Sequence, residues 1–290
     1  MSTRHLPGPG DWGGRVVPDP DPAYDLRPWI DLTAVAFGGG ANVVMQLAWP
    51  EVGYGVQESV VDSGKIFLHP WKRARTTGTY LAVALVGSDR DRELFRTAVD
   101  TVHRQVRSRA SSPVRYNAFS PQLQRWVAAC LFLGPWDYRC RVHGEPSPED
   151  AEEFYRHATR FATSLQVPRE LWPPTLADFW DYWEAGKQRI SIDERTRAYL
   201  LDILEVRFLP RPLQLLMGRW MRWVNTGFLH PEFRDAMGLR WTERDERRLR
   251  RLCAVVRRVK ALTPSVLWWG PIHLNVWDMR LRHRLGRPLV

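Results

Sequence analysis

A single histidine lies on the apolar face of a helix predicted between Asp89 and Arg109. The apolar residues of that face recur at a spacing of three and four, as one side of a helix requires: Leu94, Phe95, Ala98, Val99, Val102 and Val106. His103 follows Val99 by four residues and therefore shares the face. An imidazole in this position is either a core histidine satisfied by a hydrogen bond or an axial metal ligand, here to haem iron.

A second pair of candidate residues lies on the helix predicted over residues 70–86, which begins with a proline in its first turn. Arg73 and Thr77 are four apart and share one side of that helix. The pair is either a solvated basic turn, with the threonine bonding back to the backbone, or a face directed at an anionic or oxygen-bearing ligand.

Two other kinds of site are disfavoured. The three glycines at 38–40 are followed by no GK[ST] or GxGxxG pattern, which favours a plain helix entry over a phosphate cradle. Cys130, Cys140 and Cys253 are odd in number and have no CxxC spacing, which indicates neither a disulfide framework nor a zinc site. A reducing, cytoplasmic location is expected.

The helices that must position these residues predict an all-α fold of about ten helices, since no alternating strand pattern and no repeat is present. Residues 1–23 are rich in Pro, Gly and Asp and are expected to form a flexible tail that wraps the body, followed by one domain over residues 24–290. The segment after Pro264 carries three tryptophans and is expected to pack across the body. The predicted helices cover about residues 24–37, 38–49, 54–61, 70–86, 89–109, 121–133, 146–166, 175–186, 192–204, 211–225, 231–237 and 242–262.

The overall charge gives little support for a nucleic-acid partner. The formal net charge is +10, but 38 of the 42 basic residues are Arg, and the densest basic run, residues 240–260, contains three acidic residues and is typical of a solvated helix face. No run of about 18 apolar residues predicts a transmembrane helix, and the N-terminus has no apolar core typical of a secretory signal. The pattern does not indicate an oligomeric state.

Five segments, taken in order, resemble the DUF2236 family, which contains MpaB-type oxygenases and the catalytic core of the latex clearing protein, a rubber oxygenase. They are LAWPEVGYGVQES, HPWKRARTTGTYLAVALVG, VHRQVR, SPQLQRWVAACLF and NTGFLHPEFRDAMGLRWTERDERRLRRL, and the similarity covers about residues 30–262.

The resemblance implies an all-helical fold that holds a b-type haem through one histidine, which maps onto His103. The arginine and threonine near the haem map onto Arg73 and Thr77, with Arg75 or Lys72 as reserve cations for a propionate. The acidic residue proposed as a base in the rubber oxygenase falls near Glu58, with the alignment shifted by up to one position. If buried beside the iron, Glu58 is expected to have a raised pKa.

This chain departs from the family pattern at three positions where relatives often have histidine. Trp49, Ser59 and Ala128 stand there instead. If those histidines shape the distal pocket, this pocket is drier and less basic than in most relatives, and the reaction can differ.

Two classes of function follow. The first is a haem-dependent oxygenase or oxidoreductase that acts on a small apolar or natural-product-like substrate with dioxygen or peroxide. The second is a non-catalytic helical protein that uses its Arg-rich helix at 242–260 on an acidic partner. A haem absorption band discriminates between them.

Overall fold

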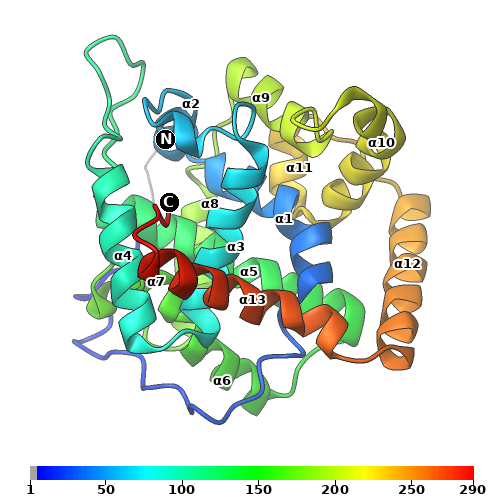
Figure 1. The fold of residues 1–290 in the computed structure, drawn as a ribbon, viewed down its shortest axis with the longest axis horizontal. Coiled ribbons are helices and arrows are strands. Elements are labelled where there is room, and N and C mark those ends of the chain that lie inside the picture. The colour runs from blue at the N-terminus through cyan, green and yellow to red at the C-terminus, as the bar shows by residue number, and fades with distance from the viewer. Residues whose placement is uncertain (1–4) are drawn as a thin grey trace.

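The computed structural model describes residues 5–290 and confirms the all-α, single-domain fold (Figure 1). Within that range the only β pairing is an isolated bridge between Arg107 and Asn117. Two 3-10 turns, η1 (Asp62–Gly64) and η2 (Arg169–Leu171), accompany the α-helices. The α-helices are α1 (Leu32–Leu47), α2 (Pro50–Gln57), α3 (Pro70–Val86), α4 (Asp89–His103), α5 (Pro121–His143), α6 (Pro148–Ala158), α7 (Arg160–Thr163), α8 (Leu176–Lys187), α9 (Glu194–Leu204), α10 (Arg211–Phe228), α11 (Pro231–Met237), α12 (Glu243–Leu262) and α13 (Val266–Arg284).

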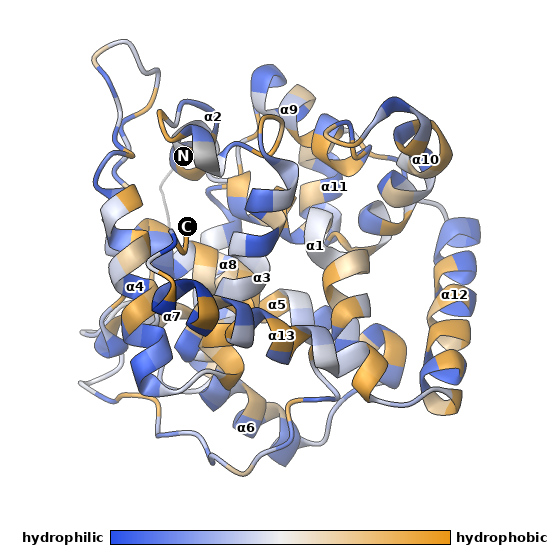
Figure 2. Cartoon of the chain, viewed as in Figure 1, coloured by the Kyte–Doolittle hydropathy of each residue, from blue (hydrophilic) through white to orange (hydrophobic). Residues whose placement is uncertain are grey.

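The core forms around α5, which packs along α1 and also contacts α7 and α12. Figure 2 shows hydrophobic colour gathered where α1 and α5 meet, whereas α12 at the edge carries both hydrophobic and hydrophilic stretches. Three buried tryptophans stack in this core: the Trp126 ring lies between Trp49 at 4.5 Å and Trp183 at 4.8 Å between ring centroids. Gly186 makes the stack possible, because a Cβ there would lie 2.8 Å from the Trp126 ring.

The three glycines at 38–40 lie inside α1 and do not start a helix, so the predicted helices at 24–37 and 38–49 are wrong in their bounds. Asp31 caps α1 by accepting hydrogen bonds from the backbone N–H groups of Thr33 and Ala34. A Cβ at Gly40 would lie 2.7 Å from Oδ1 of Asn225 on α10. That glycine is therefore needed for close packing of two helices.

The predicted end of the buried helix at Gly134–Pro135 is also wrong, since α5 continues through Pro135 to His143. Gly134 again permits a close approach, with Asn42 Nδ2 of α1 only 2.8 Å from where its Cβ would be. Asn42 also donates a hydrogen bond to the Cys130 carbonyl. Tight packing against α1 therefore outweighs the helix-breaking tendency of a Gly-Pro pair.

The segment after Pro264 crosses the body as expected, but it does so as a nineteen-residue helix that the sequence pattern did not predict. This helix, α13, lies along α3 and is joined to α4 by an ion pair between Arg280 and Asp91. Both helices that carry candidate site residues are thus held from the same side by α13 (Figure 1).

The N-terminal segment lies on the body without forming a helix before residue 32. Trp12 and Val17 are buried, and Arg125 and Arg169 donate hydrogen bonds to the carbonyls of Pro7 and Val17. The predicted wrapping is present over residues 5–23, whereas residues 1–4 of the predicted tail lie outside the described residues.

Among residues 5–290, no single helix is long and apolar enough to cross a membrane. The pair α1 and α2 passes the test of length and composition together, but the two helices are bent by 109°.

Candidate active site

One cavity of about 280 Å³ lies between α2, α3, α4, α5 and the loop that joins α4 to α5. Arg73, Thr77 and His103, the three residues singled out from the sequence, all line it. Most of the remaining wall is apolar: Val52, Val56, Val61, Phe95, Val99, Val102, Val106, Leu123, Val127, Leu131 and Leu165. The cavity is therefore a hydrophobic space with a few polar groups, as is typical of sites for small organic ligands.

His103 is the last residue of α4, so the predicted helix ends six residues earlier than expected, and Val106 lies beyond it in a turn. The Nδ1 atom of His103 is fully buried and makes no hydrogen bond of normal geometry within the described residues. The Nε2 atom has no hydrogen-bond partner among the described residues, and it is not one of the fully buried polar atoms, so it is accessible on a residue that lines the cavity.

Burial is the largest cause and lowers the pKa of His103; the Gln166 amide and Asp100 raise it to a lesser degree, and Arg73 lowers it least. The imidazole is therefore neutral near pH 7, which is the form that binds a metal. The edge of the Phe119 ring approaches the ring of His103 with centroids 6.4 Å apart. Gln166 itself is oriented by Gln124, which donates a hydrogen bond to its Oε1 atom.

Arg73 and Thr77 point the same way from α3, as their spacing predicted. Both side chains are exposed and both line the cavity, and burial by surrounding protein lowers the pKa of Arg73. Arg73 makes no ion pair with any residue of 5–290, and the Thr77 hydroxyl bonds to no group there. The neighbouring Thr76 does bond back to the Lys72 carbonyl, at 2.9 Å. Arg73 and Thr77 thus present an unpaired cation and a free hydroxyl.

The reserve cations Arg75 and Lys72 do not line the cavity. Arg75 lies beside Arg282 and Asp278 of α13, and burial together with Arg282 lowers its pKa. Two residues along a helix turn a side chain by about 200°, which places Arg75 on the far side of α3 from Arg73.

Glu58 lies just behind the cavity wall at the end of α2. Its carboxylate accepts hydrogen bonds from the Ser112 hydroxyl at 2.6 Å and the Tyr116 hydroxyl at 3.0 Å, and Arg195 lies 3.5 Å away. The hydrogen bond from Ser112 is the largest cause that lowers the pKa of Glu58. The raised pKa expected from the sequence is therefore wrong, because these donors favour the charged form.

Seven polar residues that the sequence analysis did not select also line the cavity: Gln46, Glu51, Thr76, Tyr80, Tyr116, Asn117 and Gln124. Glu51 pairs with Arg189 at 2.7 Å, and Tyr80 donates to the Phe161 carbonyl. Tyr116 connects the cavity to Glu58. Helical spacing could have found Glu51, which lies four and five residues before the wall residues Gly55 and Val56, but no local pattern marks Tyr116 in its irregular loop.

The three positions that lack the family histidine have different surroundings. Ser59 lines the cavity, whereas Trp49 and Ala128 are fully buried in the core and do not. The Trp49 indole donates to the Gly186 carbonyl at 3.0 Å, and the Arg189 guanidinium lies 3.8 Å from the centroid of its ring. Two of the three losses are therefore changes in core packing, and only Ser59 bears on the polarity of the cavity.

The donor set suits a haem better than a free metal ion. Among residues 5–290 no group of three His, Cys, Asp or Glu side chains is arranged to hold a metal. A haem needs only one protein ligand, because the porphyrin supplies the other four donors in the ring plane, and His103 offers one accessible nitrogen. About 280 Å³ is just below the usual size of a ligand pocket, so wall side chains must move outward for a porphyrin to enter.

Comparison with known proteins agrees with the resemblance. Residues 26–258 match the family described as ER-bound oxygenase mpaB/B'/Rubber oxygenase, catalytic domain. An uncharacterized protein of Mycobacterium bovis and one of Mycobacterium tuberculosis are each 49% identical over 250 residues, which is 86% of this chain and 98% of theirs. No solved structure matches the chain. The chain therefore belongs to the mpaB and rubber oxygenase catalytic-domain family and is an oxidoreductase of the oxygenase type.

Proposed function

We propose that this protein is a haem b-dependent oxygenase for a small apolar substrate, with His103 as the axial iron ligand. The observation that carries the proposal is the accessible Nε2 atom of His103 in a cavity whose other wall residues are mostly apolar. Membership of an oxygenase family favours this over a non-catalytic protein that binds an acidic partner through α12. The free thiols of Cys130, Cys140 and Cys253 support a cytoplasmic location.

A bound haem would supply the chemistry that activates dioxygen or peroxide, which no side chain can perform. His103 would hold the iron through Nε2, and Val99, Val102 and Val106 would keep water from the imidazole. Arg73 would pair with a propionate, since its guanidinium has no carboxylate partner among the described residues.

Thr77 and Tyr116 would orient the substrate and move its proton. The Thr77 hydroxyl is free to donate a hydrogen bond into the cavity. Tyr116 lines the cavity and its hydroxyl donates to the Glu58 carboxylate, so a proton released in the cavity would reach Glu58 through Tyr116. Glu58 would then act as a base from behind the wall.

The proposal is tested by the visible spectrum of protein produced with a haem precursor in the medium. Wild type is expected to show a Soret band that shifts on reduction and on addition of carbon monoxide. His103→Ala is expected to lose the band or shift it strongly. His283→Ala is the matched control, because His283 is exposed near the end of α13, and it should leave the spectrum unchanged. An unaltered spectrum in His103→Ala would show that another group holds the iron.

A further inference from the structure

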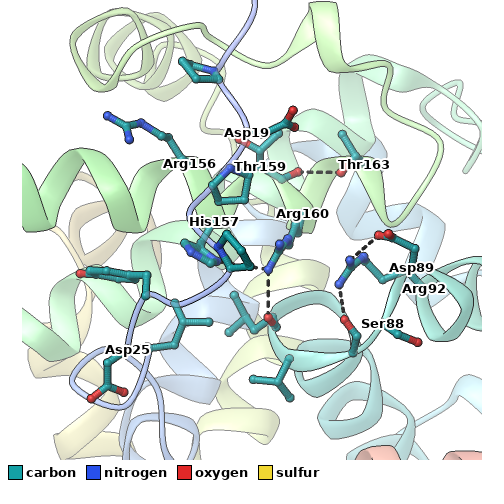
Figure 3. Close-up of a pocket in the computed structure, with 18 of the residues that line it drawn as sticks. Asp19, Asp25, Ser88, Asp89, Arg92, Arg156, His157, Thr159, Arg160 and Thr163 are labelled. Atoms are coloured by element: carbon teal, nitrogen blue, oxygen red, sulfur yellow. Dashed lines mark hydrogen bonds and ion pairs between the residues drawn. The ribbon is translucent and has the colours of Figure 1, made fainter.

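A second, larger pocket of about 1070 Å³ lies away from the proposed haem site (Figure 3). It is bounded by residues 18–27 of the N-terminal segment, the junction of α3 and α4, and residues 156–163 of α6 and α7. Tyr80 lines the cavity of His103 and Leu85 lines this pocket, and these two residues are roughly 7.5 Å apart along α3. The two spaces thus lie along different stretches of the same helix and share no lining residue.

Five arginines line this pocket, and four of them have a carboxylate of their own. The pairs are Arg27 with Asp25, Arg92 with Asp89, Arg156 with Glu153, and Arg169 with Asp19. Arg160, the fifth, has no ion-pair partner among residues 5–290. In Figure 3 its guanidinium points toward the middle of the pocket, facing Arg92, while Arg156 extends away.

The protein holds Arg160 by only one of its nitrogens. Nη1 donates to the Leu85 carbonyl at 3.3 Å and to Nδ1 of His157 at 3.2 Å. His157 is buried, and its Nε2 bonds to the Asp21 carbonyl at 2.8 Å, so Nε2 carries the proton and Nδ1 is free to accept. His157 is therefore neutral and contributes no positive charge.

The other edge of the Arg160 guanidinium is free. Its Nε and Nη2 atoms make no hydrogen bond within the described residues, and neither is among the fully buried polar atoms, so both face accessible space. These two N–H groups lie side by side in the fork that matches a carboxylate or phosphate in a bidentate pair. Burial and the nearby Arg92 lower the pKa of Arg160, whereas Asp89, Asp19 and Glu153 favour its charge to a lesser degree. A bound anion would further offset the cost of burying this charge.

We propose that this pocket binds a small organic anion, whose carboxylate or phosphate pairs with Arg160 while an apolar body lies against Leu26, Val86 and Trp269. Those apolar side chains line the same pocket as the guanidinium. The proposal does not depend on haem, because none of its residues lines the cavity of His103.

The test is isothermal titration calorimetry of the full chain at constant ionic strength with octanoate, octanol and inorganic phosphate as probes. Octanoate is expected to bind and octanol, which has no charge, is expected not to. Arg160→Gln should weaken octanoate binding by about tenfold or more. Arg27→Gln is the matched control, because it removes one positive charge from the same pocket at a residue that is exposed and already paired.

Arg160→Lys keeps the positive charge but lacks the paired N–H donors of the guanidinium. It replaces Arg160→Gln in the test if that variant does not fold. It should bind octanoate more weakly than wild type with an unchanged far-ultraviolet circular dichroism spectrum. His103→Ala should bind octanoate like wild type, which separates this site from the proposed haem site. Phosphate binding that exceeds octanoate binding and is lost in Arg160→Gln would identify phosphate as the anionic group. No binding of either anion, or equal affinity in wild type, Arg160→Gln and Arg160→Lys, would overturn the proposal.

Discussion

Arg280 donates two hydrogen bonds to the Asp91 carboxylate, from Nε at 3.0 Å and from Nη2 at 2.6 Å. Asp91 also closes the capping box of α4 by accepting from the backbone N–H and hydroxyl of Ser88. One buried carboxylate therefore both starts the helix that ends in His103 and fastens it to α13.

Asp91→Asn is expected to lower the free energy of unfolding by about 2 kcal/mol, since it removes a charged partner and weakens a cap. Urea denaturation at pH 7 measures the change. Asp89→Asn is the control: Asp89 lies two residues before Asp91 on α4, is fully exposed and has Arg92 as its ion-pair partner, so its loss should change stability much less than the loss of Asp91. An equal decrease in the free energy of unfolding in the two variants would show that the Asp91 contacts stabilise the fold no more than an exposed ion pair does.

The same pair predicts how stability depends on pH. Arg280, followed by Ser88, lowers the pKa of Asp91 well below its ordinary value of 3.8. A group with a depressed pKa in the folded state stabilises fully above its unfolded value and loses that contribution as pH falls below it. The difference between wild type and Asp91→Asn should therefore be constant from pH 7 to about 5 and shrink below pH 4. Unfolding curves at these values measure it, and a difference that shrinks near neutral pH would contradict this assignment.

The tryptophan stack gives a third prediction. Trp126→Ala is expected to cost about 3–5 kcal/mol, because it leaves a cavity between Trp49 and Trp183. Trp71→Ala is the control, since the Trp71 side chain is 73% exposed and should change stability little. Thermal unfolding of the two variants compares them. If the tryptophan stack only stabilises the core, the folded Trp126→Ala variant should keep the haem spectrum of wild type, because Trp126 does not line the cavity.

Much of the fold could be predicted from the sequence wherever a helix begins with a clear signal. Pro70 and Pro231 mark the first residues of α3 and α11, and the predicted bounds of both helices match the structure. The prediction of helix ends failed where packing between helices determines how far a helix continues. Gly40 and the Gly134–Pro135 pair look like helix breaks but lie inside α1 and α5, because neighbouring helices approach closely at Gly40 and Gly134. Such long-range contacts leave no local signal.

The candidate site shows the same limit. His103, Arg73 and Thr77 lie on regular helices, so spacing alone placed them on common faces, and the structure brings them to one cavity. Glu58 follows the last residue of α2, and its partners Ser112 and Tyr116 come from an irregular loop more than fifty residues away. Neither the surroundings of its carboxylate nor its lowered pKa could be predicted without that loop.

A fourth prediction concerns Arg73, the arginine that lines the cavity. Once haem binding is established, Arg73→Gln is expected to release haem about tenfold faster than wild type, since a propionate would lose its charged partner. Transfer of haem to apomyoglobin measures the rate. Arg75→Gln is the control on the same helix, because Arg75 faces α13, and it should release haem as wild type does. Faster release from the Arg75 variant alone would mean that Arg75 holds the propionate instead.

The last prediction concerns the protonation of Glu58. Because Ser112 and Tyr116 donate to its carboxylate, its pKa lies below the ordinary 4.5, and Glu58 is a charged proton acceptor at neutral pH. A carbon-13 NMR titration of the glutamate carboxyl groups, with Glu58→Gln to assign the signal, should place its midpoint below pH 4.5. Ser112→Ala should move that midpoint upward, and by more than Tyr116→Phe does, since the Ser112 hydrogen bond is the largest cause of the shift. A midpoint above 4.5 in wild type would mean that burial outweighs both hydrogen bonds, and Glu58 would then be a proton donor near the cavity at mildly acidic pH.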